Sequence, residues 1–202
     1  IRYGDKFILK KCNYKFEKGK IYGIRGENGA GKTTLLNAVI GIFSGEYTGN
    51  VYYNDINIRN INMTKMRREK ISYLEQDPIL MNMSVNEYLK FGLDINEKVL
   101  RKQQELLNVW GIDYLLNKDM NENGNNFSGG EKQKLSMVRS LSKDSSLILL
   151  DEPTSALDKE SIFQLMALLK KKKEAIILLV SHDQSVLAQC DVLVDIFQVQ
   201  KM

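Results

Sequence analysis

Apolar residues along this chain alternate between short unbroken runs and positions spaced three or four apart. Unbroken runs bounded by turn residues are typical of buried strands. Strand candidates of this kind, with Ser72, Asp195 and Gln198 as polar interruptions, occupy residues 21–24, 71–74, 147–150, 175–180 and 192–199. Helical spacing predicts helices at residues 32–42, 97–109 and 114–117, after Gly129, and near 162–169. Strands that alternate with helices predict an α/β fold, whose mostly parallel sheet is covered by helices on both faces.

Two regions depart from this alternation. Residues 1–25 place turns between short apolar runs, as antiparallel strands would, and residues 51–58 resemble a hairpin. Between residues 78 and 126 the character is helical. Ser84 is followed three residues later by Glu87, which is the arrangement of a capping box at a helix start.

Composition narrows the class of protein only slightly. The 202 residues are 43% hydrophobic and 27% charged, with a net charge of +4, which is ordinary for a globular protein with one substantial core. Cys12 and Cys190 lie far apart, so we expect a reducing compartment and no disulfide framework. No apolar run approaches the roughly 20 residues that span a bilayer. We therefore expect any membrane contact to come through a partner or through a segment absent from this sequence.

A phosphate-binding loop is predicted at residues 26–34, directly after the first buried run. The segment fits the pattern G-x-x-x-x-G-K-[ST], with Gly26, Gly31, Lys32 and Thr33 in the fixed positions. Glycines let successive backbone N–H groups converge on one anion, Lys32 adds a charge for the β- and γ-phosphates, and the Thr33 hydroxyl can ligate Mg²⁺. The other expected nucleotide contacts are Glu27, Asn28, Gly29, Ala30 and Thr34. A glycine-rich turn without a ligand is the alternative, but Gly-Lys-Thr after a strand is a demanding pattern.

Two acids end the third buried run. Asp151 and Glu152 follow the apolar residues 147–150, and the carboxyl ends of parallel strands are where such sheets bind ligands. We expect Asp151 to hold Mg²⁺ opposite Thr33 and Glu152 to polarise the attacking water. On their own these residues could equally be two surface acids that end a strand. The phosphate loop upstream favours the catalytic interpretation.

A second segment with small residues precedes a helix. Residues 128–131 read Ser-Gly-Gly-Glu, so the Ser128 hydroxyl and the exposed N–H groups of a helix start could bind an anion. Taken alone, the segment could as well be a helix cap with a flexible hinge.

The order of these segments resembles the nucleotide-binding domain of ABC ATPases. The motifs that carry the resemblance are the loop at 26–34, Gln76, the signature segment at 128–131, residues 147–152, residues 155–158 and His182. The resemblance covers nearly the whole chain. It implies a phosphate-loop NTPase core of RecA-like type with a mixed, mostly parallel sheet, an N-terminal antiparallel β-subdomain and an inserted helical subdomain. We place the core at residues 1–76 and 135–202 and the helical subdomain at residues 77–134, all within one ABC ATPase domain.

The resemblance also implies roles. In that family two copies face each other head to tail, and each ATP lies between the loop of one copy and the signature segment of the other. Ser128, Gly129, Gly130 and Glu131 would then contact the partner's nucleotide. Asp158 matches an aspartate that communicates between the paired sites, and Ser155 belongs to the same loop. The implied catalytic residues are Glu152, His182, Gln76 and Lys32, and the implied metal ligands are Thr33, Gln76 and Asp151.

Three of these assignments rest on position. Gln76 after a strand could be a surface residue, but it matches the family glutamine that touches Mg²⁺ or water beside the transporter contact. A lone histidine is usually structural, whereas His182 ends a strand at the place of the family's γ-phosphate contact. Tyr3 matches the aromatic that stacks on adenine and could otherwise be an ordinary strand aromatic. Glu27 and Glu131 differ from the residues that are common in the family at these positions. We expect the Glu27 side chain to point outward, and Glu131 replaces the commoner glutamine.

The kind of ABC protein follows from what the chain contains. The segment between Gln76 and Ser128 is too short for a long coiled coil, which argues against chromosome-maintenance members. Residues 71–78, 84–88 and 122–126 resemble exporter domains, so we expect a peptide or drug exporter. The implied partners are a second copy and a polytopic membrane domain, at the cytoplasmic face of the cell membrane, with no nucleic acid. The alternatives are a soluble ABC ATPase acting on nucleic acid or ribosomes, and a regulatory module without turnover.

Overall fold

Five parallel strands form the centre of the molecule. The structure is a computed structural model that describes residues 1–3, 6–7, 12–43, 48–121 and 124–196. The spatial order of the strands is β6-β7-β8-β3-β9. Their bounds in chain order are Ile21–Arg25 (β3), Ile71–Leu74 (β6), Leu147–Asp151 (β7), Ile176–Val180 (β8) and Val192–Asp195 (β9). The predicted α/β class with a parallel sheet is therefore confirmed.

Two small antiparallel sheets accompany the central one. β1 (Arg2–Tyr3) pairs with β2 (Lys6–Phe7), and β4 (Tyr52–Tyr53) pairs with β5 (Ile56–Asn57). Between β4 and β5, Asn54 and Asp55 have φ of 48° and 66°. Positive φ at both central residues is the geometry of the tight hairpin turn that suits the twist of paired strands.

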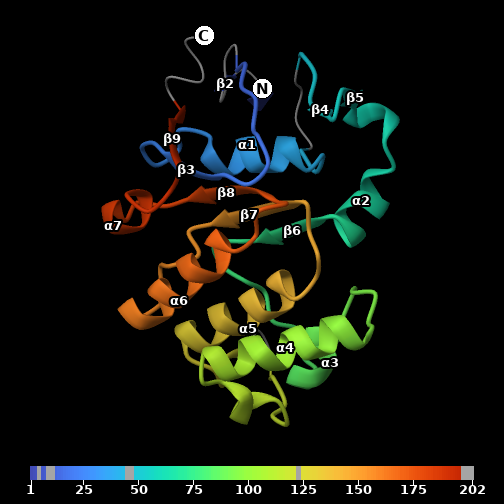
Figure 1. The fold of residues 1–202 in the computed structure, drawn as a ribbon, viewed down its shortest axis with the longest axis vertical. Coiled ribbons are helices and arrows are strands. Elements are labelled where there is room, and N and C mark those ends of the chain that lie inside the picture. Colours follow the sequence, from blue (N-terminus) through green and yellow to red (C-terminus); the bar gives the residue numbers. More distant parts are fainter. Residues whose placement is uncertain (4–5, 8–11, 44–47, 122–123, 197–202) are drawn as a thin grey trace.

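Helices cover both faces of the parallel sheet. α1 (Lys32–Val39) lies on one face, and α5 (Gly129–Leu141) and α6 (Lys159–Lys170) lie on the other (Figure 1). Strand side chains alternate between faces, and β7 shows this directly. Leu149 belongs to the core cluster that contains the leucines of α1, whereas Ile148 and Leu150 belong to the cluster of α5 and α6. β7 is buried on both sides, which explains its unbroken apolar run.

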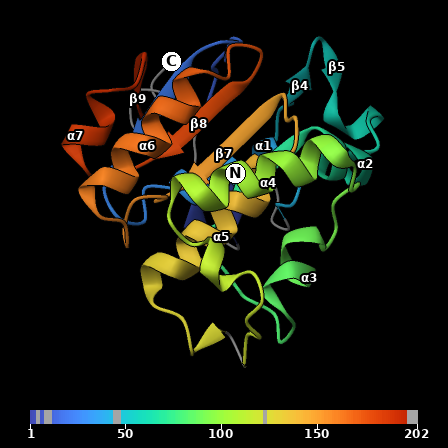
Figure 2. The same cartoon turned by 60° about the horizontal axis from the view of Figure 1, so that its bottom comes forward.

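The inserted segment is helical, as predicted. It contains α3 (Val85–Lys90), α4 (Glu97–Val109) and a short 3₁₀ turn at Asp113–Leu115. α3 and α4 both contact α5, beside which they lie in Figure 2. The capping box of Ser84 and Glu87 is confirmed at the start of α3. α5 runs without a break across the predicted boundary between residues 134 and 135, so it joins the two predicted subdomains; the division itself stays a prediction.

Several element ends differ from the predictions. α1 stops at Val39, because the chain turns at Gly41 with φ of 67°. The predicted helix at 114–117 is the 3₁₀ turn already described, and β9 is described only to Asp195, since residues 197–199 of its predicted range lie outside the described part. α2 (Met63–Glu69) and α7 (Gln184–Leu187) were not predicted. The apolar contact of α2 comes from Met63 and Met66, which are partly buried against the core, and none of its side chains is fully buried, so the apolar signal is short.

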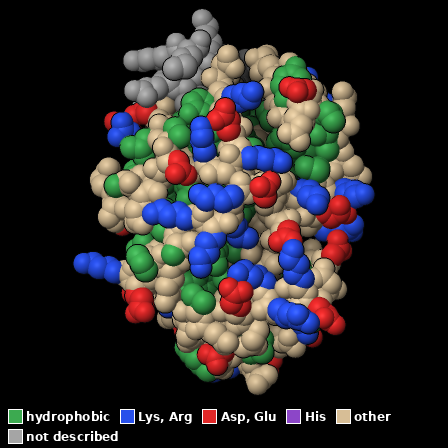
Figure 3. Space-filling view, viewed as in Figure 1, with side chains coloured by type: hydrophobic (Ala, Val, Ile, Leu, Met, Phe, Trp, Pro, Cys, Tyr) green, Lys and Arg blue, Asp and Glu red, His purple; other side chains and the backbone are tan. Residues whose placement is uncertain are grey.

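Charges are mixed on the surface. On the face seen in Figure 3, Lys and Arg side chains are interspersed with Asp and Glu. Cys12 and Cys190 are both free. Among the described helices, none has the length and apolar character that a bilayer-spanning helix requires.

Candidate active site

The carboxyl ends of three adjacent strands bring the predicted site together. Strand register places Ile24 of β3 beside Val180 of β8, and Val180 beside Asp151 of β7. The phosphate loop, the acid pair and His182 each follow directly from one of these strand ends. The edge formed in this way is where parallel α/β sheets bind ligands.

Glycine geometry shapes the loop between β3 and α1. Gly29 and Gly31 have φ of 77° and 96°, a region that residues with a side chain rarely adopt. Gly26 is required for a different reason, because a Cβ there would lie 2.5 Å from Cγ2 of Ile196. The Glu27 side chain is exposed, as expected. Asn28 is also exposed, and Ala30 and Thr34 are half-buried.

Lys32 is buried within this loop. The residue is only 8% exposed, and its ammonium donates hydrogen bonds to the carbonyls of Gly26 (2.9 Å) and Glu27 (3.1 Å). It also lies close enough to Asp151 and Glu152 for its charge to lower the pKa of both carboxyls. The loop therefore holds one positive charge directly in front of the two acids.

Asp151 and Thr33 meet across the sheet edge. The Thr33 hydroxyl donates to Oδ2 of Asp151 at 2.6 Å, although 118 residues separate the two in sequence. Asp151 is 2% exposed, and burial raises the pKa of its carboxyl, against the opposing effects of Thr33 and Lys32. A hydroxyl and a carboxylate are hard oxygen ligands of the type that Mg²⁺ prefers. These two residues therefore fit the predicted metal site.

Glu152 has an unusual backbone and an unsatisfied side chain. Its φ is 49°, and Oε1 is buried without a hydrogen-bond partner. Nε2 of His182 lies 3.3 Å from that oxygen without hydrogen-bond geometry, so the two form an ion pair only when the imidazole is protonated. Burial raises the pKa of Glu152, and a protonated His182 and a hydrogen bond from the His182 backbone to the carboxyl oppose that rise. A buried carboxylate oxygen with no partner is the kind of group that a general base presents to a water.

The signature segment is satisfied within its own helix. Ser128 caps α5: the backbone N–H and the hydroxyl of Ser128 both donate to Oε2 of Glu131 at 2.7 Å, and the Glu131 N–H donates to Ser128 Oγ at 3.2 Å. Tyr114 donates its hydroxyl to the other carboxylate oxygen at 2.6 Å. The hydrogen bonds from Tyr114 and Ser128 lower the pKa of Glu131. The helix-cap alternative is thus a structural fact, while the nucleotide role of residues 128–131 stays a prediction.

One of the remaining predicted residues, Ser155, joins this cluster through its backbone N–H, which donates to the Glu152 carbonyl at 3.3 Å. Gln76 follows β6 on the same sheet edge, and its side chain is exposed. Asp158 caps α6 by accepting the Ser161 N–H at 2.8 Å, a bond that lowers its pKa. Ser155 is exposed. Tyr3 belongs to β1, but its side chain lies outside the described part.

Two residues near the site were missed. Gln133 is buried on α5 and hydrogen-bonds to the backbone on both sides of the loop after Glu152. Tyr114 holds the Glu131 carboxylate. Gln133 carried one sequence signal, because a polar residue stands there among the apolar positions of a helix. No local sequence pattern indicated a role for Tyr114, because its hydrogen-bond partner Glu131 lies 17 residues away in the sequence.

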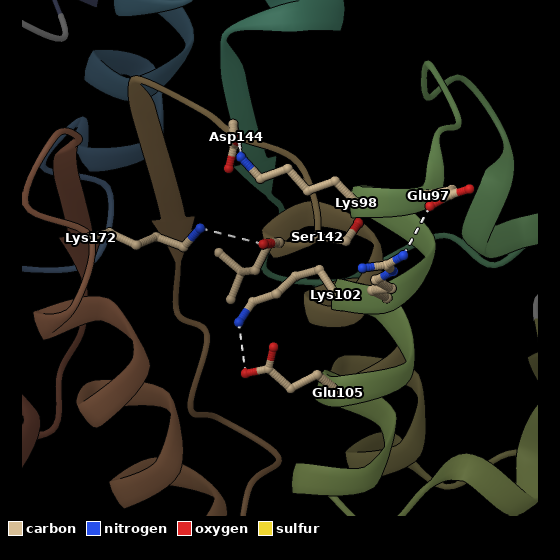
Figure 4. Close-up of a pocket in the computed structure, with 9 residues that line it drawn as sticks. Glu97, Lys98, Lys102, Glu105, Ser142, Asp144 and Lys172 are labelled. Atoms are coloured by element: carbon tan, nitrogen blue, oxygen red, sulfur yellow. Dashed lines mark hydrogen bonds and ion pairs between the residues drawn. The ribbon is translucent and has the colours of Figure 1, made fainter.

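A separate cavity of about 450 Å³ lies between α4, the end of α5 and Lys172 (Figure 4). Six of its charged side chains form three ion pairs, Lys98 with Asp144, Lys102 with Glu105 and Arg101 with Glu97. Lys172 donates to the Leu141 carbonyl at 3.4 Å, and burial lowers its pKa. None of the predicted site residues lines this cavity, so it is separate from the acid pair and the phosphate loop.

The arrangement of loop, acid pair and histidine can be compared with known proteins. A family model described as ABC transporter matches residues 9–155. The chain belongs to the ABC transporter family. As a member it binds ATP with Mg²⁺ and hydrolyses ATP.

Relatives and solved structures agree with the family. A probable ABC transporter ATP-binding/permease protein of Haemophilus influenzae is 34% identical over 96% of this chain, which spans only 36% of that relative. The energy-coupling factor transporter ATP-binding protein EcfA1 of Thermotoga maritima is 34% identical over 97% of the chain and 75% of its own length. A solved ATP-binding subunit of an ABC transporter superposes with a TM-score of 0.84 at 25% identity, over 96% of this chain and 81% of the other.

Proposed function

We propose that two copies of this ABC ATPase domain close head to tail around two ATP molecules and that closure drives export through membrane domains. The observation that carries the pairing is the placement of two predicted phosphate-binding segments on separate helices of one chain. The phosphate loop precedes α1 on one face of the sheet, and the signature segment precedes α5 on the other (Figure 1). A second copy would bring the missing half to each site. Binding free energy would then favour the closed pair.

The roles within each site follow from the contacts described. Glu152 receives a proton from the attacking water, since its buried Oε1 has no hydrogen-bond partner within the described structure. His182, beside that oxygen, contacts the γ-phosphate, and Lys32 neutralises charge on the β- and γ-phosphates. Thr33 and Asp151 would hold Mg²⁺, which supplies further charge neutralisation on the phosphates. Gln76, which follows β6, would complete this shell, and Tyr3 would stack on adenine.

Glu152→Gln tests the assignment of the base and the pairing together. The variant keeps the shape of the side chain but cannot accept the proton, so we expect ATP binding to persist while turnover falls by at least about 100-fold. ATP should then convert the variant from monomer to dimer in size-exclusion chromatography with light scattering. The exposed Glu160→Gln on α6 is the matched control and should retain turnover. Normal turnover in Glu152→Gln would refute the base, and a monomer with ATP bound would refute the pairing.

Lys32→Ala tests the phosphate loop. Removal of the ammonium should weaken ATP binding, because a charge that compensates the phosphates is lost. Titration with a fluorescent ATP analogue measures the change. Unchanged affinity would show that the phosphates bind elsewhere.

Export is supported by the resemblance of residues 71–78, 84–88 and 122–126 to exporter domains. The Haemophilus relative is described as an ATP-binding/permease protein, which agrees with a membrane domain as partner at the cytoplasmic face of the membrane. The mixed charges in Figure 3 offer no single-sign surface for nucleic acid on that face.

A transport assay in vesicles tests the direction in which substrate moves. Inside-out proteoliposomes would contain this ATPase domain together with the membrane domain encoded in the same or the adjacent reading frame. ATP in the medium should move a peptide or a drug-like dye into the lumen, and the Glu152→Gln variant should not. Movement out of the lumen would indicate import. ATPase activity stimulated by RNA, without stimulation by any membrane domain, would replace the proposal with a soluble ABC ATPase.

A further inference from the structure

We infer that Gln133 is a positioning residue that links the signature segment of this chain to its own general base. The inference rests on the head-to-tail pair proposed above, in which residues 128–131 contact the partner's ATP and Glu152 acts on the chain's own ATP. Gln133 would make hydrolysis at one site depend on nucleotide bound at the other.

Both ends of the Gln133 amide are engaged by backbone groups of one loop. The residue is 2% exposed on the second turn of α5. Its Nε2 donates to the carbonyl of Glu152 at 3.1 Å, and its Oε1 accepts the N–H of Ala156 at 3.0 Å. A side-chain amide is the group that satisfies a donor and an acceptor at once. Gln133 therefore holds the start of this loop at two points.

Glu152 needs such support because its backbone is strained. A φ of 49° is uncommon for a residue with a side chain, and such geometry persists only where neighbouring contacts impose it. The Glu152 N–H donates to the Val180 carbonyl at 3.1 Å, which fixes one side of the residue to β8. The bond from Gln133 fixes the other side to α5. The direction of the Glu152 carboxylate thus depends on where α5 lies.

The start of α5 also packs directly on the same loop. A Cβ at Gly130 would lie 3.0 Å from the Ala156 carbonyl oxygen, and one at Gly129 would lie 3.5 Å from the Ala156 Cβ. Gly130 therefore permits an approach that a larger residue would resist. Lys134 adds an ion pair to Asp158 at 3.5 Å. A shift of the first helical turn, such as phosphate binding at Ser128 would cause, would therefore be passed to this loop and to Glu152.

The test compares Gln133→Met with a matched buried glutamine. Gln133→Met keeps the length of the side chain but removes both hydrogen bonds. Gln103→Met is the control, because Gln103 is 4% exposed and donates to the Leu89 carbonyl at 2.6 Å within the helical segment. Both variants lose buried hydrogen bonds, so we expect both to lower the unfolding temperature. Only Gln133→Met should lower kcat, by roughly 10- to 100-fold, with the KM for ATP within about threefold.

A double-mutant cycle tests the link itself. Ser128→Ala weakens the contact with the partner's phosphate and should lower kcat. If Gln133 transmits that contact, Gln133→Met combined with Ser128→Ala should be no slower than the slower single variant by more than about twofold. Gln133→Glu serves as a second variant, since it keeps size and polarity but places an oxygen against the Glu152 carbonyl. It should lower kcat as Gln133→Met does.

Each outcome decides the inference. A normal kcat in both Gln133 variants, an equal loss in Gln103→Met, or multiplicative losses in the double variant would overturn it. Failure of this inference can be told apart from failure of the head-to-tail pairing, because the pairing is tested by whether Glu152→Gln forms dimers with ATP. If those dimers form but the Gln133 variants keep a normal kcat, only the proposed link between the signature segment and Glu152 is refuted.

Discussion

Replacing Glu152 by glycine should make the chain more stable and inactive. Glu152 carries two structural costs in the folded chain, a left-handed backbone and a buried carboxylate oxygen without a hydrogen-bond partner. Glycine adopts positive φ without steric strain and has no side chain to leave unsatisfied. A residue selected for stability alone would therefore not be glutamate.

The magnitude can be estimated from these costs. Relief of the backbone strain is worth about 1–2 kcal/mol, and removal of a buried unsatisfied acceptor about 1–3 kcal/mol. Against these gains stand roughly 0.5–1 kcal/mol for the entropy of glycine in the unfolded chain and up to about 1 kcal/mol for the partly exposed pair with His182. The net gain lies between about 0 and 4.5 kcal/mol, with a central value of about 2 kcal/mol. For a chain of this size the central value corresponds to a rise in Tm of roughly 4–8 °C.

The assay is thermal unfolding of three variants beside the parent. Glu152→Gln keeps the strained backbone and should gain less stability than Glu152→Gly. Asp55→Gly is the backbone control, because Asp55 has a φ of 66° in an exposed turn remote from the site. It should gain less than about 1 kcal/mol, since aspartate tolerates this geometry. A Tm of Glu152→Gly at or below that of Glu152→Gln would refute the strain argument.

Three further predictions concern the site. Thr33→Ala removes the hydroxyl that donates to Asp151 at 2.6 Å, so ATP affinity should fall about tenfold with Mg²⁺ present and little in EDTA; an equal fall in both titrations would contradict the metal role. Burial raises the pKa of Glu152, and a base acts only when deprotonated, so kcat should decline with falling pH through a value above the usual range of glutamate. If kcat in the pH–rate profile declines instead around the ordinary pKa of a glutamate, the buried environment assigned to Glu152 would be contradicted. Tyr114→Phe removes the hydrogen bond to Glu131. Loss of this bond should lower the unfolding free energy by about 1 kcal/mol, and an unchanged Tm would show that Ser128 is sufficient to hold the Glu131 carboxylate.

The raised pKa of Glu152 also sets the sign of its effect on stability. Because the folded-state pKa lies above the unfolded value, the folded chain binds more protons between the two values. This group therefore favours folding at low pH and loses that contribution as pH rises through the folded pKa. Activity and the stability contribution of this one residue accordingly change in opposite directions with pH.

The features that could be predicted from sequence are those encoded within a few consecutive residues. The phosphate loop is one, because its glycines and Lys32 lie within nine positions and their hydrogen bonds are local. β7 is another, because burial on both faces requires an unbroken apolar run. The contact between Asp151 and Thr33 was also predictable, because parallel strands place their carboxyl ends at the same edge of the sheet.

Contacts that depend on how helices pack were not predictable. Gln133 occupies a helix position whose partner is a backbone loop 19 and 23 residues away, and spacing alone does not identify such a partner. The cap at Ser128 is a local feature and was one of the two alternatives stated for residues 128–131, as the same S-x-x-E pattern predicted the cap at Ser84.

That cap narrows how the signature segment could bind a phosphate. Of the first N–H groups of α5, which have no partner within the helix ladder, the Glu131 N–H is directed to the Ser128 hydroxyl, and the Ser128 N–H just outside the helix is directed to the Glu131 carboxylate. Gly129 and Gly130 lie between them and carry no side chain that could shield their N–H groups. The Ser128 hydroxyl has a single proton, which it donates to Glu131. An incoming γ-phosphate would therefore meet the two glycine N–H groups first and compete with Glu131 for that proton.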